Sequence, residues 1–71
     1  MLEVKKSIFD DIVIHFYPAS PYIVKAQINF RRDRQVWQSI VIKDVNAALD
    51  YIARHEFCAD LPYRVITHKN Y

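Results

Sequence analysis

The chain contains no glycine among its 71 residues. Loops that cradle phosphate depend on glycine for positive φ angles and for close approach of the backbone to the ligand. The sequence therefore excludes a P-loop, a dinucleotide-binding fingerprint and a kinase-type glycine loop. Its turns must rely on proline, asparagine, aspartate and serine, which favours type I turns or longer connections over two-residue glycine loops.

Cysteine and long apolar runs are also scarce. Cys58 is the single cysteine, which excludes an internal disulfide framework and makes a reducing compartment the expected one. The N-terminal segment has acidic residues within its first dozen positions and no apolar run of signal-peptide length. No segment approaches the ~20 apolar residues that a membrane span needs. These absences predict a soluble, cytoplasmic protein.

Charge of either sign is modest. Ten Lys and Arg residues against eight Asp and Glu residues give a formal net charge of +2, and hydrophobic residues make up 52% of the chain. This balance is typical of a globular domain and supplies no strong overall field, so nucleic-acid binding would require local clustering of basic residues. At this length we expect one compact domain over residues 1–71, with a core only just large enough.

Three segments have the alternating apolar pattern of β-strands. They span about residues 8–17, 22–30 and 35–43. The two prolines of "PASP" (18–21) separate the first strand from the second. The segment "RRDR" (31–34) then forms a four-residue hairpin connection to the third strand.

The hydrophobic period changes after the third strand. Apolar residues follow helical spacing at Val45, Ala48, Leu49 and Ile52, which predicts a helix over about 44–57. Asp44 is a natural N-cap for it. A short C-terminal strand is predicted at about 63–68. The expected fold is therefore α+β, a three-stranded antiparallel meander with one helix packed on one face.

One helix can cover only one face of such a sheet, so the other face is the candidate functional surface. The alternation assigns to it a mixture of apolar, aromatic, polar and basic side chains, namely Val13, His15, Tyr17, Ile23, Lys25, Gln27, Trp37, Val41 and Lys43. Such a mixture favours an interaction surface over a merely solvated one.

The stretch "NFRRDRQVW" (29–37) places three of the five arginines between two large aromatic residues. Guanidinium groups match the geometry of phosphates and carboxylates, so Arg31, Arg32 and Arg34 can contact a partner. In the alternative interpretation they form a solvated hairpin tip whose charges discourage edge pairing. Trp37 is either an exposed anchor beside them or, if the strand register shifts by one residue, part of the core.

No constellation of residues favours catalysis or metal binding. His55 and Cys58 lie three positions apart, but no third group is evident to orient the histidine as a base. A zinc site would need a second close-set ligand pair, which His15 and His68 do not provide. Cys58 is better interpreted as a small buried residue at the helix end. We therefore expect no enzymatic activity, no metal and no cofactor.

Two functional hypotheses follow. The first is a small protein-binding module, an inhibitor or adaptor that acts through the uncovered sheet face and the 31–34 tip, with homodimerisation as a further possibility. Its predicted partner-binding residues are Tyr17, Ile23, Lys25, Arg31, Arg32, Arg34, Trp37 and Lys43. The alternative is a small DNA- or RNA-binding domain that uses the same face and the arginine turn, together with Gln27.

The order of elements over residues 22–56 resembles two groups of proteins. A three-stranded antiparallel sheet backed by one helix is similar to the AP2-type and integrase arm-binding DNA domains, which read the major groove with the sheet. AP2-type domains usually carry glycines around the strands, and this chain has none. A hairpin that runs into "KDVNAALDYI" (43–52) also looks like several small phage-encoded anti-CRISPR proteins, which implies a protein of a phage or mobile element that blocks its target by surface contact.

Overall fold

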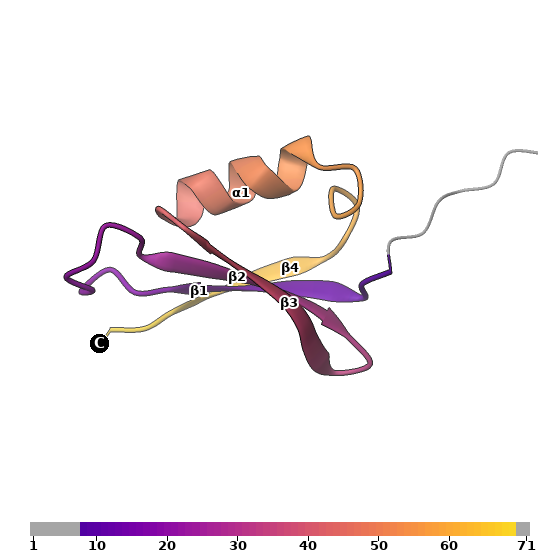
Figure 1. The fold of residues 1–71 in the computed structure, drawn as a ribbon, viewed down its shortest axis with the longest axis horizontal. Coiled ribbons are helices and arrows are strands. Elements are labelled where there is room, and N and C mark those ends of the chain that lie inside the picture. The colour runs from indigo at the N-terminus through magenta and orange to yellow at the C-terminus, as the bar shows by residue number, and fades with distance from the viewer. Residues whose placement is uncertain (1–7, 70–71) are drawn as a thin grey trace, which may run out of the picture.

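A computed structural model describes residues 8–69 of the chain. The elements in chain order are β1 (Asp11–Phe16), β2 (Ala26–Arg32), β3 (Gln35–Ile42), α1 (Val45–Arg54) and β4 (Tyr63–Thr67). The strands form one mixed sheet in the order β3-β2-β1-β4, and α1 lies over one face of it (Figure 1). The predicted α+β class, the antiparallel meander and the single helix are confirmed.

The C-terminal strand completes the sheet by pairing with β1 in parallel, with Ile14 opposite Val65. The chain leaves β3 at one edge of the sheet, crosses above it as α1 and returns as β4 at the opposite edge (Figure 1). A parallel pair requires a crossover of this kind, and the helix provides it. Within residues 8–69, no helix has the length and apolar character needed to cross a membrane.

The second strand begins at Ala26, four residues later than its alternating pattern predicts. Pairing with β1 closes where the Tyr17 amide donates to the Lys25 carbonyl at 2.7 Å. The residues between these two positions must reverse the chain, and the two prolines among them have no amide to donate to a ladder. Tyr22 and Val24 are consequently exposed instead of facing the helix.

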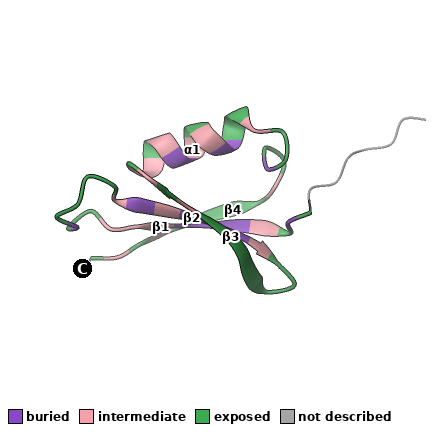
Figure 2. Cartoon of the chain, in the orientation of Figure 1, coloured by how far each residue is buried: buried purple, intermediate pink, exposed green. Residues whose placement is uncertain are grey.

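The core lies between α1 and the middle of the sheet. Ala48 and Ile52 of α1 are buried against a cluster that includes Ile14, Ile28 and Phe30. Each fully buried isoleucine or phenylalanine stabilises the fold by about 1.5–3 kcal/mol. Buried positions concentrate on β1, β2 and the inner side of α1, whereas β3 and β4 are mostly exposed (Figure 2). The two outer strands are therefore the least protected part of the sheet.

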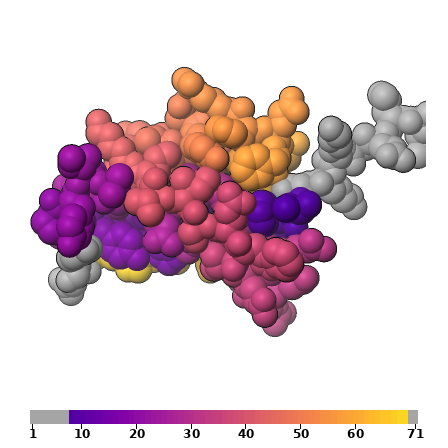
Figure 3. Space-filling view, in the orientation of Figure 1, coloured from indigo at the N-terminus to yellow at the C-terminus, as the bar shows by residue number. Residues whose placement is uncertain are grey.

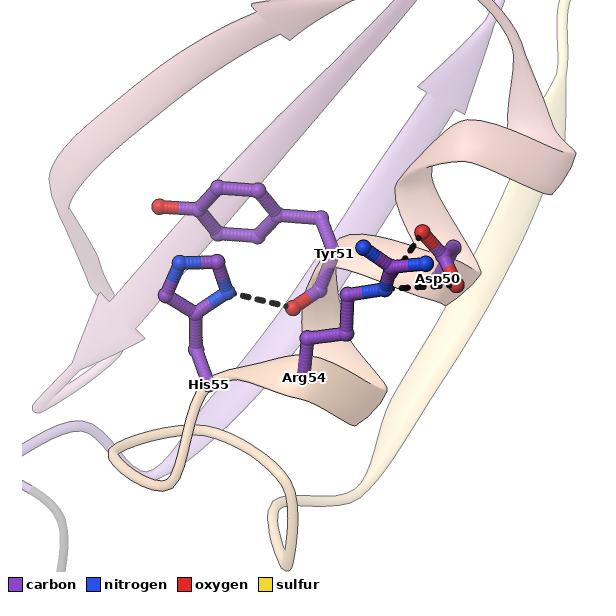
Figure 4. Close-up of polar contacts among 4 residues, drawn as sticks. All are labelled: Asp50, Tyr51, Arg54 and His55. Carbon is purple, nitrogen blue, oxygen red and sulfur yellow. Dashed lines mark hydrogen bonds and ion pairs between the residues drawn. The ribbon is translucent and has the colours of Figure 1, made fainter.

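Side chains satisfy both ends of α1. The Asp44 carboxylate accepts from the Ala47 amide at 2.8 Å, which confirms it as the N-cap. The helix ends at Arg54, earlier than predicted, because the backbone of His55 is extended. The His55 ring then donates from Nδ1 to the Tyr51 carbonyl at 2.7 Å (Figure 4), since a carbonyl can only accept.

The thiol of Cys58 provides a second contact at the same helix end. Its Sγ lies 3.6 Å from the Ile52 carbonyl and 3.5 Å from the His55 carbonyl. Burial raises the pKa of the Cys58 thiol, which favours the protonated form that can donate to these oxygens. The expectation of a small buried residue at this position is confirmed, with the addition that the thiol helps to cap the helix.

We expect Asp44→Ala to lower the free energy of unfolding by about 1 kcal/mol, because it removes the N-cap acceptor. Urea denaturation followed by circular dichroism measures this change. Asp50→Ala is the matched control: Asp50 pairs with Arg54 at 3.0 Å on the exposed face of α1 (Figure 4), so its loss should change stability by only about 0.3 kcal/mol. Equal effects of the two substitutions would contradict the capping role.

Candidate partner-binding surface

The sheet face opposite α1, called the free face below, carries the candidate surface. Strand register places two rows of side chains on it, one of Arg64, Val13, Asn29 and Ser39 and the next of Ile66, His15, Gln27 and Val41. Within residues 8–69, no helix or further strand packs on these rows. The predicted uncovered face therefore exists in the described part of the chain.

The centre of the free face is a preformed polar network. Asn29 Oδ1 accepts from Gln27 Nε2 at 2.9 Å and from Ser39 Oγ at 2.8 Å. Val13, which the sequence pattern also assigns to this face, is only 4% exposed. The middle of the face is thus largely buried and held by fixed amide groups, and the exposed apolar side chains lie toward the ends of the strands.

The hairpin between β2 and β3 is tighter than predicted. Only Asp33 and Arg34 connect the strands, and both have positive φ, 53° and 66°. Such angles are the geometry of two-residue hairpin loops whose twist matches that of the flanking strands. The expectation of a four-residue connection was wrong. Asp33 and Arg34 adopt positive φ although neither is glycine, so the two-residue turn forms at the cost of backbone strain. Arg34 carries more of that strain, since aspartate tolerates the left-handed region better.

Trp37 lies beside this turn and is 58% exposed. A register shift opposite Phe30 and Arg31 leaves it as the extra residue of a β-bulge. The Arg32 guanidinium carbon is 5.5 Å from the centroid of the indole ring, within the range of a cation–π contact. The hypothesis that Trp37 belongs to the core is therefore wrong. Residues 31–34 and Trp37, called the tip below, project from the body of the molecule (Figure 3).

The three arginines of the tip are not equivalent. Arg31 Nε is 3.6 Å from Asp11 Oδ1, a buried oxygen that has no hydrogen-bond partner in the described part of the chain. That distance is too long for a hydrogen bond but short enough for the cation to compensate the carboxylate. Arg32 Nε is 3.9 Å from the highly exposed Asp33, and Arg34 forms no ion pair with residues 8–69. Arg32 and Arg34 are thus the cations that the tip presents outward.

The other predicted partner-binding residues gather at the opposite end of the strands. Backbone hydrogen bonds join Tyr17 to Lys25 at 2.7 Å and Lys25 to Lys43 at 2.9 Å. Ile23, predicted to lie on the second strand, belongs to the preceding loop and is 85% exposed. These four residues are called the loop end below. A hollow of about 410 Å³ beside them is lined in part by Tyr17, Lys25 and Val41.

The structure therefore divides the predicted site into two clusters, the tip and the loop end. β2 joins them, and its length from Ala26 to Arg32 corresponds to roughly 20 Å of extended chain. A protein interface of ordinary size, about 800 Å² on each partner, can cover both clusters and the polar network between them.

Charge is segregated between the two layers of the fold. In residues 8–43 and 63–69, which contain the sheet and its loops, seven Lys and Arg residues outnumber three aspartates, a net charge of +4. In residues 44–62, which contain α1 and its flanks, Arg54 stands against four acidic residues, a net charge of −3. The modest net charge of the chain is thus the sum of a basic sheet layer and an acidic helical layer.

Two histidines meet near the loop end of the free face. His15 Nδ1 lies 2.9 Å from His68 Nε2, and the ring of Tyr17 stacks on His68 with centroids 4.4 Å apart. One imidazole nitrogen of the contact must donate and the other accept, so two imidazolium ions cannot maintain it. Burial, then the nearby His68 and Arg64, lower the pKa of His15.

The four side chains considered as zinc ligands do not converge. His55 and Cys58 cap the helix on one side of the sheet, and His15 and His68 pair on the other. Among residues 8–69, no three His, Cys, Asp or Glu side chains are grouped so as to hold a metal ion.

Two features of the free face were not anticipated as parts of the site. The Asn29 network was detectable in principle, because alternation places Gln27 and Asn29 on one side of the same strand. The pairing of His15 with His68, and the position of Arg64 near them, depend on where β4 joins the sheet. No local pattern carries that information.

We expect Arg34→Gly to raise the free energy of unfolding by about 0.5–1 kcal/mol, because glycine adopts positive φ without strain. Urea denaturation of the variant and the wild type measures the difference. Arg32→Gly, at a strand position of the same hairpin, is the control and should be destabilising. A loss of stability in Arg34→Gly would contradict the strained turn.

Stability should fall as the pH decreases through 6.5, the ordinary pKa of histidine. Because the pKa of His15 is lowered by folding, the unfolded chain binds more protons in the window between the folded pKa and 6.5. Urea denaturation at a series of pH values measures the slope, and His15→Gln should flatten it. Arg64→Gln should flatten it less, because that cation is the smallest of the three causes. An unchanged slope in His15→Gln would contradict this assignment.

Comparisons with known proteins give no assignment for this geometry. No family model matches the chain, and no significant match was found among curated proteins or among solved structures. The functional interpretation of the tip, the loop end and the free face consequently depends on their own chemistry.

Proposed function

We propose that this domain is a protein-binding module, a small inhibitor or adaptor that docks through the free face and the tip. The observation that carries the proposal is the exposed Trp37, held at a bulge beneath the Arg32 guanidinium. Tryptophan and arginine are the residues most enriched among those that dominate binding energy at protein interfaces. A bulge and a tight turn hold both on the rigid end of a hairpin, which limits the entropy lost on docking.

The backbone of the tip supports the same proposal. Arg34 is held in the left-handed region, which is unfavourable for a residue with a side chain, and its guanidinium has no ion-pair partner within residues 8–69. Strain of this kind is often found where a side chain must be presented in a particular direction. Arg34 is thus suited to a partner carboxylate at the rim of a contact centred on Trp37.

The partner is a protein with an acidic surface. The sheet layer has a net charge of +4, and Lys25 and Lys43 extend the positive charge to the loop end. Complementary charge would accelerate association and orient the domain with its acidic helical layer directed away. A blocking protein of the anti-CRISPR kind is one concrete form of such a module.

The charge segregation also favours a second candidate, a DNA- or RNA-binding domain. Arg32 and Arg34 lie at the turn of the β2–β3 hairpin, and Lys25 and Lys43 lie at its open end, so together they could contact phosphates of one nucleic acid. The amides of Gln27 and Asn29 lie between them. In this case log Kd would rise with the logarithm of salt concentration by about 0.9 for each phosphate neutralised.

Affinity capture with matched baits tests the main proposal. Wild type, Trp37→Ala and Arg54→Ala are used as baits in the same extract, and bound proteins are quantified by mass spectrometry. Arg54 is an exposed cation of α1, so Arg54→Ala should retain every specific partner. Trp37→Ala should weaken binding of a purified partner by about 2 kcal/mol, or roughly thirtyfold.

The outcomes separate the two candidates. A protein that Trp37→Ala loses and Arg54→Ala keeps supports the main proposal. Fluorescence anisotropy with generic duplex and single-stranded oligonucleotides at low salt addresses the alternative. Salt-dependent binding that Arg32→Ala with Arg34→Ala removes, without any protein lost from the Trp37→Ala bait, would replace the main proposal by the second.

A further inference from the structure

The outer edge of β4 has backbone hydrogen-bonding groups that pair with no strand of residues 8–69. The Ile12 amide donates to the Pro62 carbonyl at 3.0 Å, and the His68 amide donates to the Phe16 carbonyl at 2.7 Å. In a parallel ladder only alternate residues bond to the neighbouring strand, so Arg64 and Ile66 direct their amides and carbonyls toward β1. The three residues between these positions, Tyr63, Val65 and Thr67, therefore direct theirs outward.

Within residues 8–69, this edge has little of the protection that natural sheets usually provide, and its one charged side chain is Arg64 on the free face. Tyr63 and Val65 are 53% and 40% exposed, since α1 packs mainly over the other three strands. Proline, lysine and β-bulges discourage pairing at a sheet edge, and β4 contains none of the three. The opposite edge of the sheet, β3, has the bulge at Trp37. Of the two edges, β4 is the one suited to accept another strand.

We infer that β4 pairs with β4 of a second copy of this chain, antiparallel and centred on Val65. In this register Val65 faces its own copy, and Tyr63 of each copy faces Thr67 of the other. All three outward-facing residues of both copies then exchange amide–carbonyl hydrogen bonds. A register centred on Arg64 or on Ile66 leaves one outward residue of each copy unpaired, and the Arg64 register also sets two guanidinium groups opposite each other.

Charge complementarity selects a second copy and its direction. Asp60 precedes β4 and Lys69 follows it, so the strand is flanked by opposite charges. An antiparallel copy brings the acidic end of one strand toward the basic end of the other, whereas a parallel copy would place like charges together. The register centred on Val65 also sets Arg64 beside Ile66 of the other copy and away from its arginine.

The dimer has a defined architecture. The sheet continues through the two copies of β4 into eight strands, with both α1 helices on the same side and both free faces on the other. The two-fold axis passes midway between the two copies of Val65, perpendicular to the sheet, so the interface is isologous. The two tips lie at the far ends of the extended sheet, because β3 is the outermost strand of each copy. This pairing uses neither the tip nor the loop end, so it is independent of the proposed function.

Sedimentation velocity over a range of concentrations up to millimolar tests the inference. The wild type should pass from monomer to dimer in the micromolar range, because a single pair of short strands buries less than the ~1,200 Å² of a typical stable complex. Val65→Lys places two ammonium groups at the two-fold axis and should weaken the dimer by about tenfold or more. Val36→Lys, an exposed valine of the other edge strand, is the matched control and should leave it intact.

Disulfide trapping tests the register. Val65→Cys places two thiols across a hydrogen-bonded pair, whose Cα separation of about 5.5 Å is compatible with a disulfide. It should cross-link faster on mild oxidation than Val36→Cys at the same concentration, and the native Cys58 does not compete because it is buried.

Three results would overturn the inference. They are a wild type that remains monomeric throughout, a dimer that survives Val65→Lys, and a dimer lost in Val36→Lys. Circular dichroism of each variant confirms that it is folded before its association is measured. Failure of the wild-type bait to capture a specific partner has no bearing on any of these outcomes, so the two proposals fail separately.

Discussion

Ala48 and Ile52 of α1 are buried against Ile14, Ile28 and Phe30 in the middle of the sheet, and the rest of the molecule depends on this contact. A helix of 10 residues is long enough to cover the central strands of one face but not the whole width of the sheet. The contact therefore determines which parts of the sheet the helix leaves uncovered, namely the free face and the helix-facing side of β4. Both proposed interaction surfaces are consequences of how little one short helix can cover.

The absence of glycine affects two places in the fold, the C-terminal end of α1 and the hairpin turn between β2 and β3. Helices often end with glycine in the left-handed region; here the His55 ring and the Cys58 thiol occupy the free carbonyls instead. At the hairpin, a side-chain contact cannot replace the positive φ that the turn requires, so Asp33 and Arg34 adopt positive φ themselves. The helix end is therefore well satisfied, whereas the hairpin stores strain at the place where the exposed arginines and Trp37 lie.

The local sequence pattern predicted most of the helices and strands. The features that it did not predict depend on pairing between segments that are distant in the sequence. Alternation identified β1 and β3, and helical spacing with Asp44 identified α1 and its start. The same alternation extended β2 too far, because residues 22–25 continue the pattern in a segment whose ladder has already closed. Whether Trp37 is exposed could not be predicted, because the bulge adds one residue to the ladder. Such an extra residue changes which face of the sheet a side chain occupies, and the sequence pattern does not reveal it. The parallel position of β4, and with it the contact of His15 with His68, required a pairing between distant segments.

The position of the only tryptophan has a practical consequence. In most small domains the indole lies in the core, so its emission follows unfolding. Here the indole of Trp37 is already largely in water and lies beneath a guanidinium at the end of a hairpin. Its spectrum should thus change little when the chain unfolds and strongly when another molecule covers the ring. The chain carries an intrinsic optical reporter of docking in place of one for folding.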